Sequence, residues 1–222
     1  MQNFIIASSI RHLKEKGETR MKCKYITIER EYGSGGTKIA RLLSEQTGVP
    51  CYGREILEEV SKKLNVPVEQ IDRYEETATG SFLYSLYMMS QTVSGNADML
   101  PESGHIYVEE QAVIRDLARN KKAIFLGHCA SEALKEKAGV VKVFIHCPNE
   151  EMKKQRIIED YGIEESQIDA TKKRFDKKRS GYYSANTGEK WDYLKQYDLV
   201  LDSGTLGMDG CVAVLKSLLD EK

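Results

Sequence analysis

The stretch ITIEREYGSGGTKIARLL, residues 26 to 43, constrains the fold of this chain more than any other segment. An apolar segment with β-strand character leads into a glycine-rich turn, and the turn leads into residues with helical apolar spacing. Successive N–H groups of such a turn can point at an anion at the helix N-terminus, and glycine permits the close approach. The pattern therefore predicts a phosphate-binding loop, with an ordinary strand-to-helix turn as the alternative.

The loop departs from the common phosphate-loop pattern G-x-x-x-x-G-K-[ST]. Alignment on Gly35 places Arg30 at the first glycine of the pattern and Gly36 at its lysine. A cation near the transferred phosphate normally neutralises the charge that develops there. We expect Arg30, at the strand end, to supply this cation, with Lys38 on the first helical turn as the other candidate within this stretch.

The predicted phosphate cradle consists of the turn and the start of the helix. A hydroxyl from Ser34 or Thr37 could contact a phosphate or a magnesium ion. The residues predicted to bind the nucleotide are Gly33, Ser34, Gly35, Gly36 and Thr37.

Short apolar segments alternate with helical patterns along the rest of the chain. Strands are predicted within residues 25–28, 49–52, 122–127, 140–147 and 197–204. Helices are predicted after the glycine turn and over residues 54–65, 106–120, 150–162, 166–183 and 207–222. Apolar strands separated by helices indicate an α/β fold with a parallel sheet that is buried on both faces. No linker divides the chain, so we predict one core domain.

Composition excludes several functional classes. The net charge of −1 provides no general attraction to nucleic acid or membranes, and no apolar run is long enough to span a bilayer. The five cysteines are scattered and form no CxxC pair, which argues against a zinc site or a disulfide framework and favours the reducing cytoplasm. No residues have metal-ligand spacing, so no protein-built metal site is predicted.

Two segments stand apart from the regular pattern. Residues 1–23 form an N-terminal extension, and because Met21 directly precedes the first strand, they could be an optional helix or an upstream start artefact. Residues 77–104 mix aromatic residues and methionines with glycine and serine. This segment could be core, the surface of a homodimer, or a lining of the substrate site.

Basic residues elsewhere could complete a phosphate site. The run KKRFDKKR, residues 172–179, contains six cations, among which Arg174 and Arg179 are candidates for a mobile lid that closes over phosphates. A solvated helix face is the alternative reading. Arg156, on the preceding helix, could also face the phosphates.

Several blocks together resemble the cytidylate kinase-like family, relatives of the P-loop nucleoside monophosphate kinases. The resemblance covers about residues 24–220, and the blocks are REYGSGG, AIFLGHCA, VFIHCP, RIIEDYGI, DKKRSGYY and YDLVLDSG. It implies a three-layer α/β/α domain over residues 24–222 with a parallel five-stranded sheet, an acceptor-binding insertion and a helical lid at about 163–190. It also implies a phosphotransferase that uses ATP and Mg²⁺ and a nucleotide acceptor such as CMP or dCMP.

The resemblance also bears on single residues. Asp176-x-x-Arg179 matches part of the family's lid motif, which makes Arg179 the leading lid cation. Relatives usually carry Gly-Arg-Cys where this chain has Gly127-His128-Cys129, and the arginine helps to hold the acceptor in true cytidylate kinases. His128 is therefore expected at the acceptor. The resemblance also implies a phosphate contact for Arg54, because it follows the second strand, where nucleoside monophosphate kinases bind the acceptor. A regulatory nucleotide-binding protein with weak or no catalysis, and a kinase of another small acceptor, remain the alternative functions.

Overall fold

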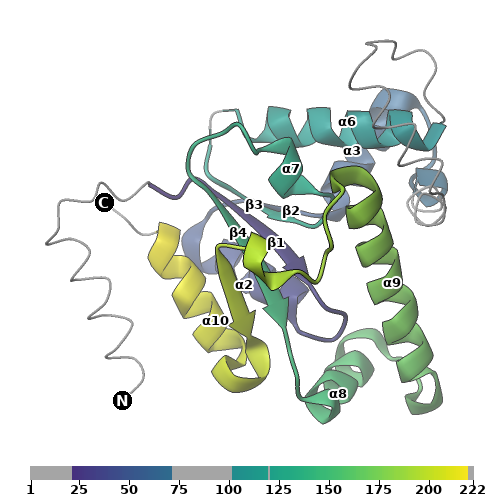
Figure 1. Ribbon diagram of the computed structural model, residues 1–222, viewed down its shortest axis with the longest axis vertical. Helices are drawn as coiled ribbons and strands as arrows, with labels where there is room; N and C mark the ends of the chain where they lie inside the picture. The colour runs from purple at the N-terminus through teal and green to yellow at the C-terminus, as the bar shows by residue number, and fades with distance from the viewer. Residues whose placement is uncertain (1–21, 72–101, 120, 220–222) are drawn as a thin grey trace, which may run out of the picture.

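The computed structural model describes residues 22–71, 102–119 and 121–219, and strands and helices alternate through them (Figure 1). All but the last two residues of the expected N-terminal extension lie outside this part of the chain. The same holds for residues 77–101 of the aromatic and methionine-rich segment, whereas its last three residues begin a helix.

The centre of the molecule is a parallel sheet of five strands, which confirms the predicted fold class. The strands are β1 (Tyr25–Arg30), β2 (Cys51–Tyr52), β3 (Ala123–Leu126), β4 (Val140–His146) and β5 (Leu199–Asp202). Their order in the sheet is β2-β3-β1-β4-β5, so β1 lies in the middle with β3 on one side and β4 on the other. Parallel pairing brings the carboxyl ends of all five strands to one edge, and the glycine turn follows the central strand at that edge.

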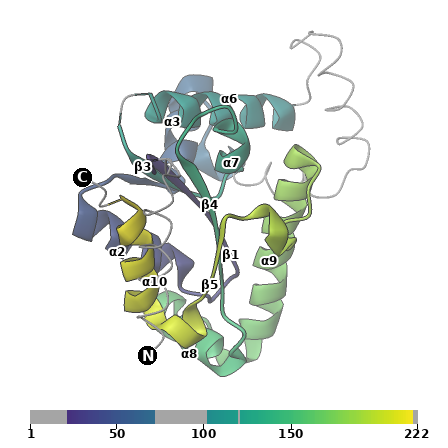
Figure 2. The ribbon, with the colours of Figure 1, turned by 60° about the vertical axis from the view of Figure 1, so that its left-hand side comes forward.

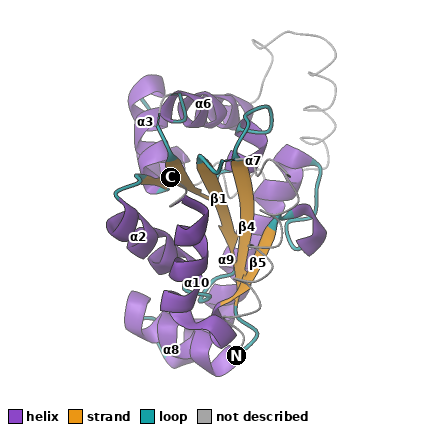
Figure 3. Ribbon diagram, turned by 90° about the vertical axis from the view of Figure 1, so that its left-hand side faces the viewer, coloured by secondary structure: helices purple, strands orange, loops and turns teal. Residues whose placement is uncertain are grey.

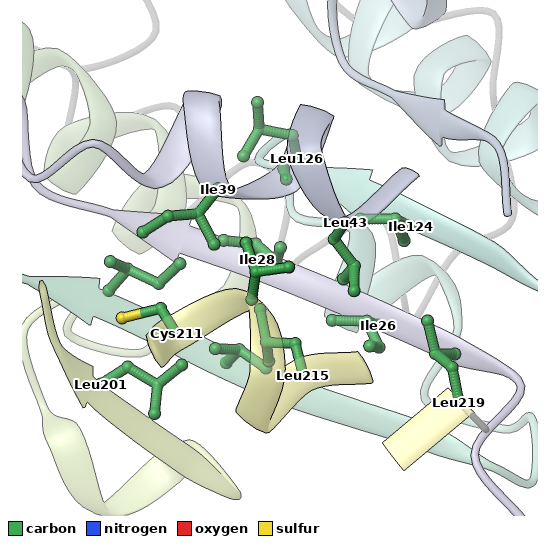
Figure 4. Close-up of a cluster of buried hydrophobic side chains, with 14 of the residues drawn as sticks. Ile26, Ile28, Ile39, Leu43, Ile124, Leu126, Leu201, Cys211, Leu215 and Leu219 are labelled. Atoms are coloured by element: carbon green, nitrogen blue, oxygen red, sulfur yellow. The ribbon is translucent and has the colours of Figure 1, made fainter. Parts of the chain in front are cut away.

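One face of the sheet is covered by α2 (Gly36–Thr47) and α10 (Ser203–Leu219), as Figure 4 shows. Ile39 and Leu43 of α2 and Leu215 of α10 pack against Ile26 and Ile28 of β1. All five side chains are buried, because the apolar stripe of each helix meets a continuous apolar strand. This core holds the start of α2 in place beside the end of β1.

The other face is covered by α3 (Arg54–Leu64), α6 (Glu102–Leu117) and the short α7 (Ala130–Ala133). Their apolar residues form a second core with Tyr25 of β1 and Phe125 of β3. The helix layers on both sides of the sheet can be followed in Figure 3. This arrangement confirms the predicted three-layer α/β/α architecture.

The expected lid region contains a long helix, α9 (Ile168–Thr187), which follows α8 (Glu150–Tyr161). Figure 2 shows α9 on the opposite side of the sheet from α2 and α10. Tyr182 and Tyr183 near the end of α9 join Trp191 and Phe144 in an aromatic cluster. The C-terminal end of α9 is thereby packed against the sheet.

Several element boundaries differ from the sequence predictions. Helix α6 starts at Glu102 rather than at residue 106, and α9 continues to Thr187 rather than ending at residue 183. The short helix α7 was not predicted, because four residues are too few for an apolar period to show. Helix α10 starts at Ser203 and is interrupted at Gly207, whose φ of 68° is not helical.

Candidate functional site

The loop between β1 and α2 depends on glycine at two positions. Gly33 and Gly35 both have φ of 77°, a left-handed conformation that other residues rarely adopt. A Cβ atom on Gly33 would lie 2.9 Å from Cδ1 of Ile157, and one on Gly35 would lie 2.9 Å from Cε of Met208. The loop is therefore held tightly between α8 and α10.

Gly36 has a different role, because it makes room for Arg30. A Cβ atom on Gly36 would lie 2.7 Å from Cβ and 2.9 Å from Cγ of Arg30. The far end of the same side chain approaches Gly127, where an added Cβ would lie 2.6 Å from Nη1 of Arg30. The position that holds lysine in the common pattern is thus occupied by glycine, and the stem of an arginine from the strand lies against it.

Main-chain N–H groups at the start of α2 are open to a ligand. The helix begins after Gly35 without a side-chain cap. Within the described residues, the N–H groups of Gly35, Thr37 and Lys38 make no hydrogen bond to the rest of the chain. The N-terminus of a helix attracts anions through such groups and through the helix dipole. The geometry fits a cradle for phosphate.

The two hydroxyl groups of the loop differ in their bonding. The Ser34 hydroxyl donates to the carbonyl oxygen of Glu31 at 2.8 Å and accepts the N–H of Gly36 at 3.3 Å, so it stabilises the turn. The Thr37 hydroxyl makes no hydrogen bond to a described residue. Of the two, Thr37 is the one available to a ligand.

Arg156 holds the loop from within the protein. Its guanidinium is buried and donates to the carbonyl oxygen of Ser34 at 3.0 Å and to the hydroxyl and carbonyl oxygens of Ser203 at 3.0 and 3.1 Å. The Ser203 hydroxyl also donates to the Ser34 carbonyl oxygen, at 2.6 Å. Arg156 therefore connects the loop to the start of α10, and these bonds already occupy both Nη atoms.

A cavity of about 240 Å³ lies next to the loop, at the carboxyl ends of β1 and β3. Four predicted site residues line it, namely Arg30, Arg54, His128 and Arg179. The remaining lining residues are Glu29, Leu57, Gly127, Cys129, Phe175, Lys178, Tyr182 and Tyr183. Arginine and lysine side chains from β1, α3 and α9 converge here, which is a charge arrangement suited to an anionic ligand.

Helix α9 is attached directly to the loop. The carboxylate of Asp176 accepts the main-chain N–H of Tyr32 at 2.7 Å, and Arg179 donates to the carbonyl oxygen of Arg30 at 3.0 Å. The Tyr32 ring stacks on Phe175 with centroids 4.6 Å apart. Burial raises the pKa of Asp176 above its ordinary value, with the Tyr32 N–H and the Arg179 charge opposing the shift. Helix α9 therefore lies directly against the glycine loop.

The turn after β3 has an unusual backbone. Gly127, His128 and Cys129 follow one another with φ of 79°, 56° and 50°. Such conformations are costly for residues other than glycine and occur often at functional sites. His128 Nδ1 lies 3.6 Å from Oε2 of the fully buried Glu110, and Tyr182 donates to the same oxygen at 2.5 Å. This network fixes His128 at the wall of the cavity.

Glu29 is a buried carboxylate in this basic cavity. The indole Nε1 of Trp191 donates to its Oε2 at 3.0 Å, and only 8% of the residue is exposed. Burial raises the pKa of Glu29, although Arg30, the Trp191 hydrogen bond, Arg179 and His128 act in the opposite direction. Sequence reasoning missed Glu29, because a polar residue near the end of a strand carries no local signal of its surroundings.

Two predicted catalytic residues lie outside the cavity. The ammonium group of Lys38 is 3.6 Å from Oδ1 of Asp160, and its side chain is 55% exposed. Arg174 is also exposed, with its Cζ 5.0 Å from the Phe175 ring centroid. Helix α9 instead contributes Lys178 and Arg179 to the cavity wall. The orientation of α9 about its own axis therefore determines which residues of the basic run line the cavity.

Two carboxylates near the loop already make hydrogen bonds or ion pairs within the protein. Asp202 accepts the N–H groups of Gly204 and Thr205 and the Thr205 hydroxyl, an arrangement that starts α10 and lowers the pKa of Asp202. Glu31 pairs with Lys153 at 2.8 Å. No cluster of three or more His, Cys, Asp or Glu side chains suited to a metal ion occurs among the described residues. A magnesium ion here would be held by phosphate oxygens, water and the Thr37 hydroxyl.

Two further predictions concern the whole chain. All five cysteines are free, and four of them are buried. Burial raises the pKa of Cys51 and Cys211 to about 11, which keeps both as neutral thiols. None of the helices in the described residues has the length and apolar character needed to cross a membrane.

The chain is similar in sequence to one protein family and in structure to several solved proteins. The sequence model of the cytidylate kinase-like family matches residues 25–205. A crystal structure of an uncharacterized protein from Eubacterium ventriosum superposes with a TM-score of 0.65 and 22% identity, over 89% of this chain and 99% of that chain. This likeness shows a shared fold.

Shikimate kinases superpose less closely. The enzyme from Bacteroides thetaiotaomicron gives a TM-score of 0.48 at 12% identity, over 89% of this chain and 98% of that chain. The enzyme from Acinetobacter baumannii, solved in complex with shikimate, gives a TM-score of 0.45 at 14% identity, over 94% of this chain and 98% of that chain. No curated protein matches the chain.

Proposed function

The chain belongs to the cytidylate kinase-like family, and we propose that it transfers the γ-phosphoryl group of ATP to a nucleoside monophosphate, CMP or dCMP. One observation carries this proposal, namely that the open N–H groups at the start of α2 lie beside a cavity walled by Arg30, Arg54, Lys178 and Arg179. A phosphate cradle next to a second anion site is what transfer between two phosphates requires.

The donor would occupy the loop. The N–H groups of Gly35, Thr37 and Lys38 are directed to the β- and γ-phosphates in this proposal, and Thr37 contributes to magnesium binding. When bound, magnesium neutralises charge on the phosphates and helps to orient them. Arg30 supplies the cation that the lysine of the common pattern would supply, because its side chain lies against Gly36, the equivalent position.

The acceptor would occupy the cavity. Its phosphate oxygen is the nucleophile, so the protein needs only to align the two phosphates and stabilise the charge between them. Arg54 and Lys178 approach from different helices, α3 and α9. Arg179 lies nearest to the loop through its bond to the Arg30 carbonyl oxygen, and therefore suits the transferring group.

A coupled assay of ADP release over a panel of nucleoside monophosphates tests this function. Arg30→Ala and Arg179→Ala should each reduce kcat/KM by about a hundredfold or more, because each removes a cation from the phosphate path. Lys177→Ala is the matched control, since Lys177 lies in the same basic run but is exposed and outside the cavity. ATP binding without turnover of any acceptor would instead identify a regulatory nucleotide-binding protein.

A kinase of another small acceptor is the second candidate. The cavity of about 240 Å³ is smaller than the pockets of roughly 300–1,000 Å³ that hold drug-sized ligands. Its wall also contains a carboxylate, which no phosphate group would contact favourably. Small hydroxylated acids therefore belong in the acceptor panel, and turnover of such an acid in preference to every nucleotide would favour this second function.

A further inference from the structure

Glu29 is the one acidic side chain among the residues that line the described cavity. It precedes Arg30 on β1 and shares its strand face with Tyr25 and Thr27, because side chains alternate along a strand. The cations Arg30 and Arg179 lie close enough to lower the pKa of Glu29 against the effect of burial. A carboxylate placed in a basic anion site needs an explanation, since its burial disfavours folding and its charge repels phosphate.

The two oxygens of Glu29 have different surroundings. Oε2 accepts the indole N–H of Trp191, which is 5% exposed and packs edge-on against Phe144 with ring centroids 5.2 Å apart. Oε1 makes no hydrogen bond to any residue that the structure describes. Because an indole nitrogen only donates, Trp191 determines which way the carboxylate faces.

We propose that Glu29 selects the acceptor by accepting, through Oε1, a hydrogen bond from an O–H or N–H group of the molecule that is phosphorylated. This inference rests on the proposed function. The acceptor therefore carries a hydrogen-bond donor in addition to the anionic group held by the arginines. For a nucleoside monophosphate, we assign that donor to either an N–H group of the base or the 2′-hydroxyl of the sugar.

Glu29→Gln reverses the character of the cavity-facing atom. The Trp191 N–H still requires an acceptor, so the glutamine carbonyl oxygen takes the place of Oε2 and the amide NH₂ group replaces Oε1 in the cavity. The variant thus presents a donor where the wild-type protein presents an acceptor. Glu31→Gln is the matched control, because it removes the same charge two residues away at a side chain outside the cavity.

The experiment is isothermal titration of CMP, UMP and dCMP into each protein in the presence of magnesium and ADP. CMP and UMP exchange donor and acceptor atoms at positions 3 and 4 of the base, whereas dCMP lacks the 2′-hydroxyl. We expect Glu29→Gln to change one of the affinity ratios, CMP to UMP or CMP to dCMP, by about tenfold or more, since one buried hydrogen bond to a charged group is lost. The altered ratio identifies the source of the donor.

Unchanged ratios in Glu29→Gln would overturn the inference, as would equal changes in Glu31→Gln or a wild-type protein that binds none of the three nucleotides. Turnover in the same samples reports on the proposed function separately. Turnover with unchanged ratios overturns the role of Glu29 alone, and altered ratios without turnover overturn the kinase activity alone.

Discussion

The carboxylate of Asp176 on α9 accepts a hydrogen bond from the main-chain N–H of Tyr32 in the glycine loop between β1 and α2, at 2.7 Å. Arg179, one turn further along α9, donates to the carbonyl oxygen of Arg30 at 3.0 Å. Helix α9 and the loop are thus joined at both ends of the segment from Arg30 to Tyr32. If the loop binds a nucleotide as proposed, we expect nucleotide binding and the position of α9 to be coupled through these two bonds.

Removal of the Asp176 side chain should destabilise the protein. Asp176→Ala leaves the partly buried N–H of Tyr32 without a partner, and the expected loss in the free energy of unfolding is about 1–3 kcal/mol. Asp176→Asn should cost less, because the amide oxygen can still accept this bond and a buried charge is removed. Urea unfolding of both variants measures the difference, and equal losses would show that the bond to Tyr32 contributes nothing.

A methyl group at Gly36 should disable the site while the fold persists. In Gly36→Ala the new Cβ would lie 2.7 Å from Cβ of Arg30, so the arginine must leave its position or the loop must shift. We expect kcat/KM to fall by about a hundredfold, as for loss of a catalytic cation. Gly210→Ala in α10 is the control, since its nearest neighbour is the exposed Leu206, and it should retain full turnover in the coupled assay.

Stability should depend on pH through Glu29. Its pKa is raised above the ordinary value of 4.5 in the folded protein. A group of this kind contributes stability at low pH, and that contribution is lost as the pH rises through the folded pKa. Glu29→Gln does not titrate at this position, so it should gain stability relative to the wild-type protein as the pH rises above 4.5 and through the raised pKa of Glu29.

Urea unfolding of both proteins across this pH range checks the expectation. Groups with altered pKa that do not interact with Glu29, such as Asp176, cancel in the comparison. A difference in stability that stays constant with pH would contradict the raised pKa of Glu29.

Lys178 should matter for the acceptor, and its neighbour Lys177 should not. Lys178 lines the cavity, whereas Lys177, the residue before it, is exposed and does not line the cavity. Lys178→Ala should raise the KM for the acceptor by about tenfold, with a smaller effect on kcat, because it removes one charged contact from binding. Initial-rate measurements on the two variants provide the comparison, and equal values would place the acceptor away from α9.

Local patterns in the sequence were enough for the fold class and for the glycine-rich turn between the central strand and the helix after it. The strands are short apolar segments, and the helices follow an apolar period with recognisable ends, such as Asn149 and Gly162 around α8. The glycine residues of the turn also permit the positive φ that the structure shows at Gly33 and Gly35. Each of these features depends on residues close together in the chain, so local residue types and the spacing of apolar residues can predict it.

The composition of the cavity wall depends on contacts between distant segments. Glu29 meets Trp191, and Glu110 meets Tyr182 and His128, through the packing of α6 and α9 against the sheet. None of these pairs can be predicted from the neighbouring residues in the sequence. The same is true of the basic run on α9, because the orientation of the helix places Lys178 and Arg179 at the cavity and leaves Arg174 exposed to solvent.

The sequence by itself therefore determined a parallel α/β domain with a glycine loop at a helix start, and it supplied the candidate cations. Only the tertiary structure decided that the stem of Arg30 lies against Gly36, that Asp176 joins α9 to the loop, and that the carboxylate of Glu29 lines the basic cavity. The physical reason is that the apolar period and the hydrogen bonds of helices and tight turns involve residues close together in the chain. The charges and hydrogen bonds of a cavity instead come from side chains that packing brings together from distant segments.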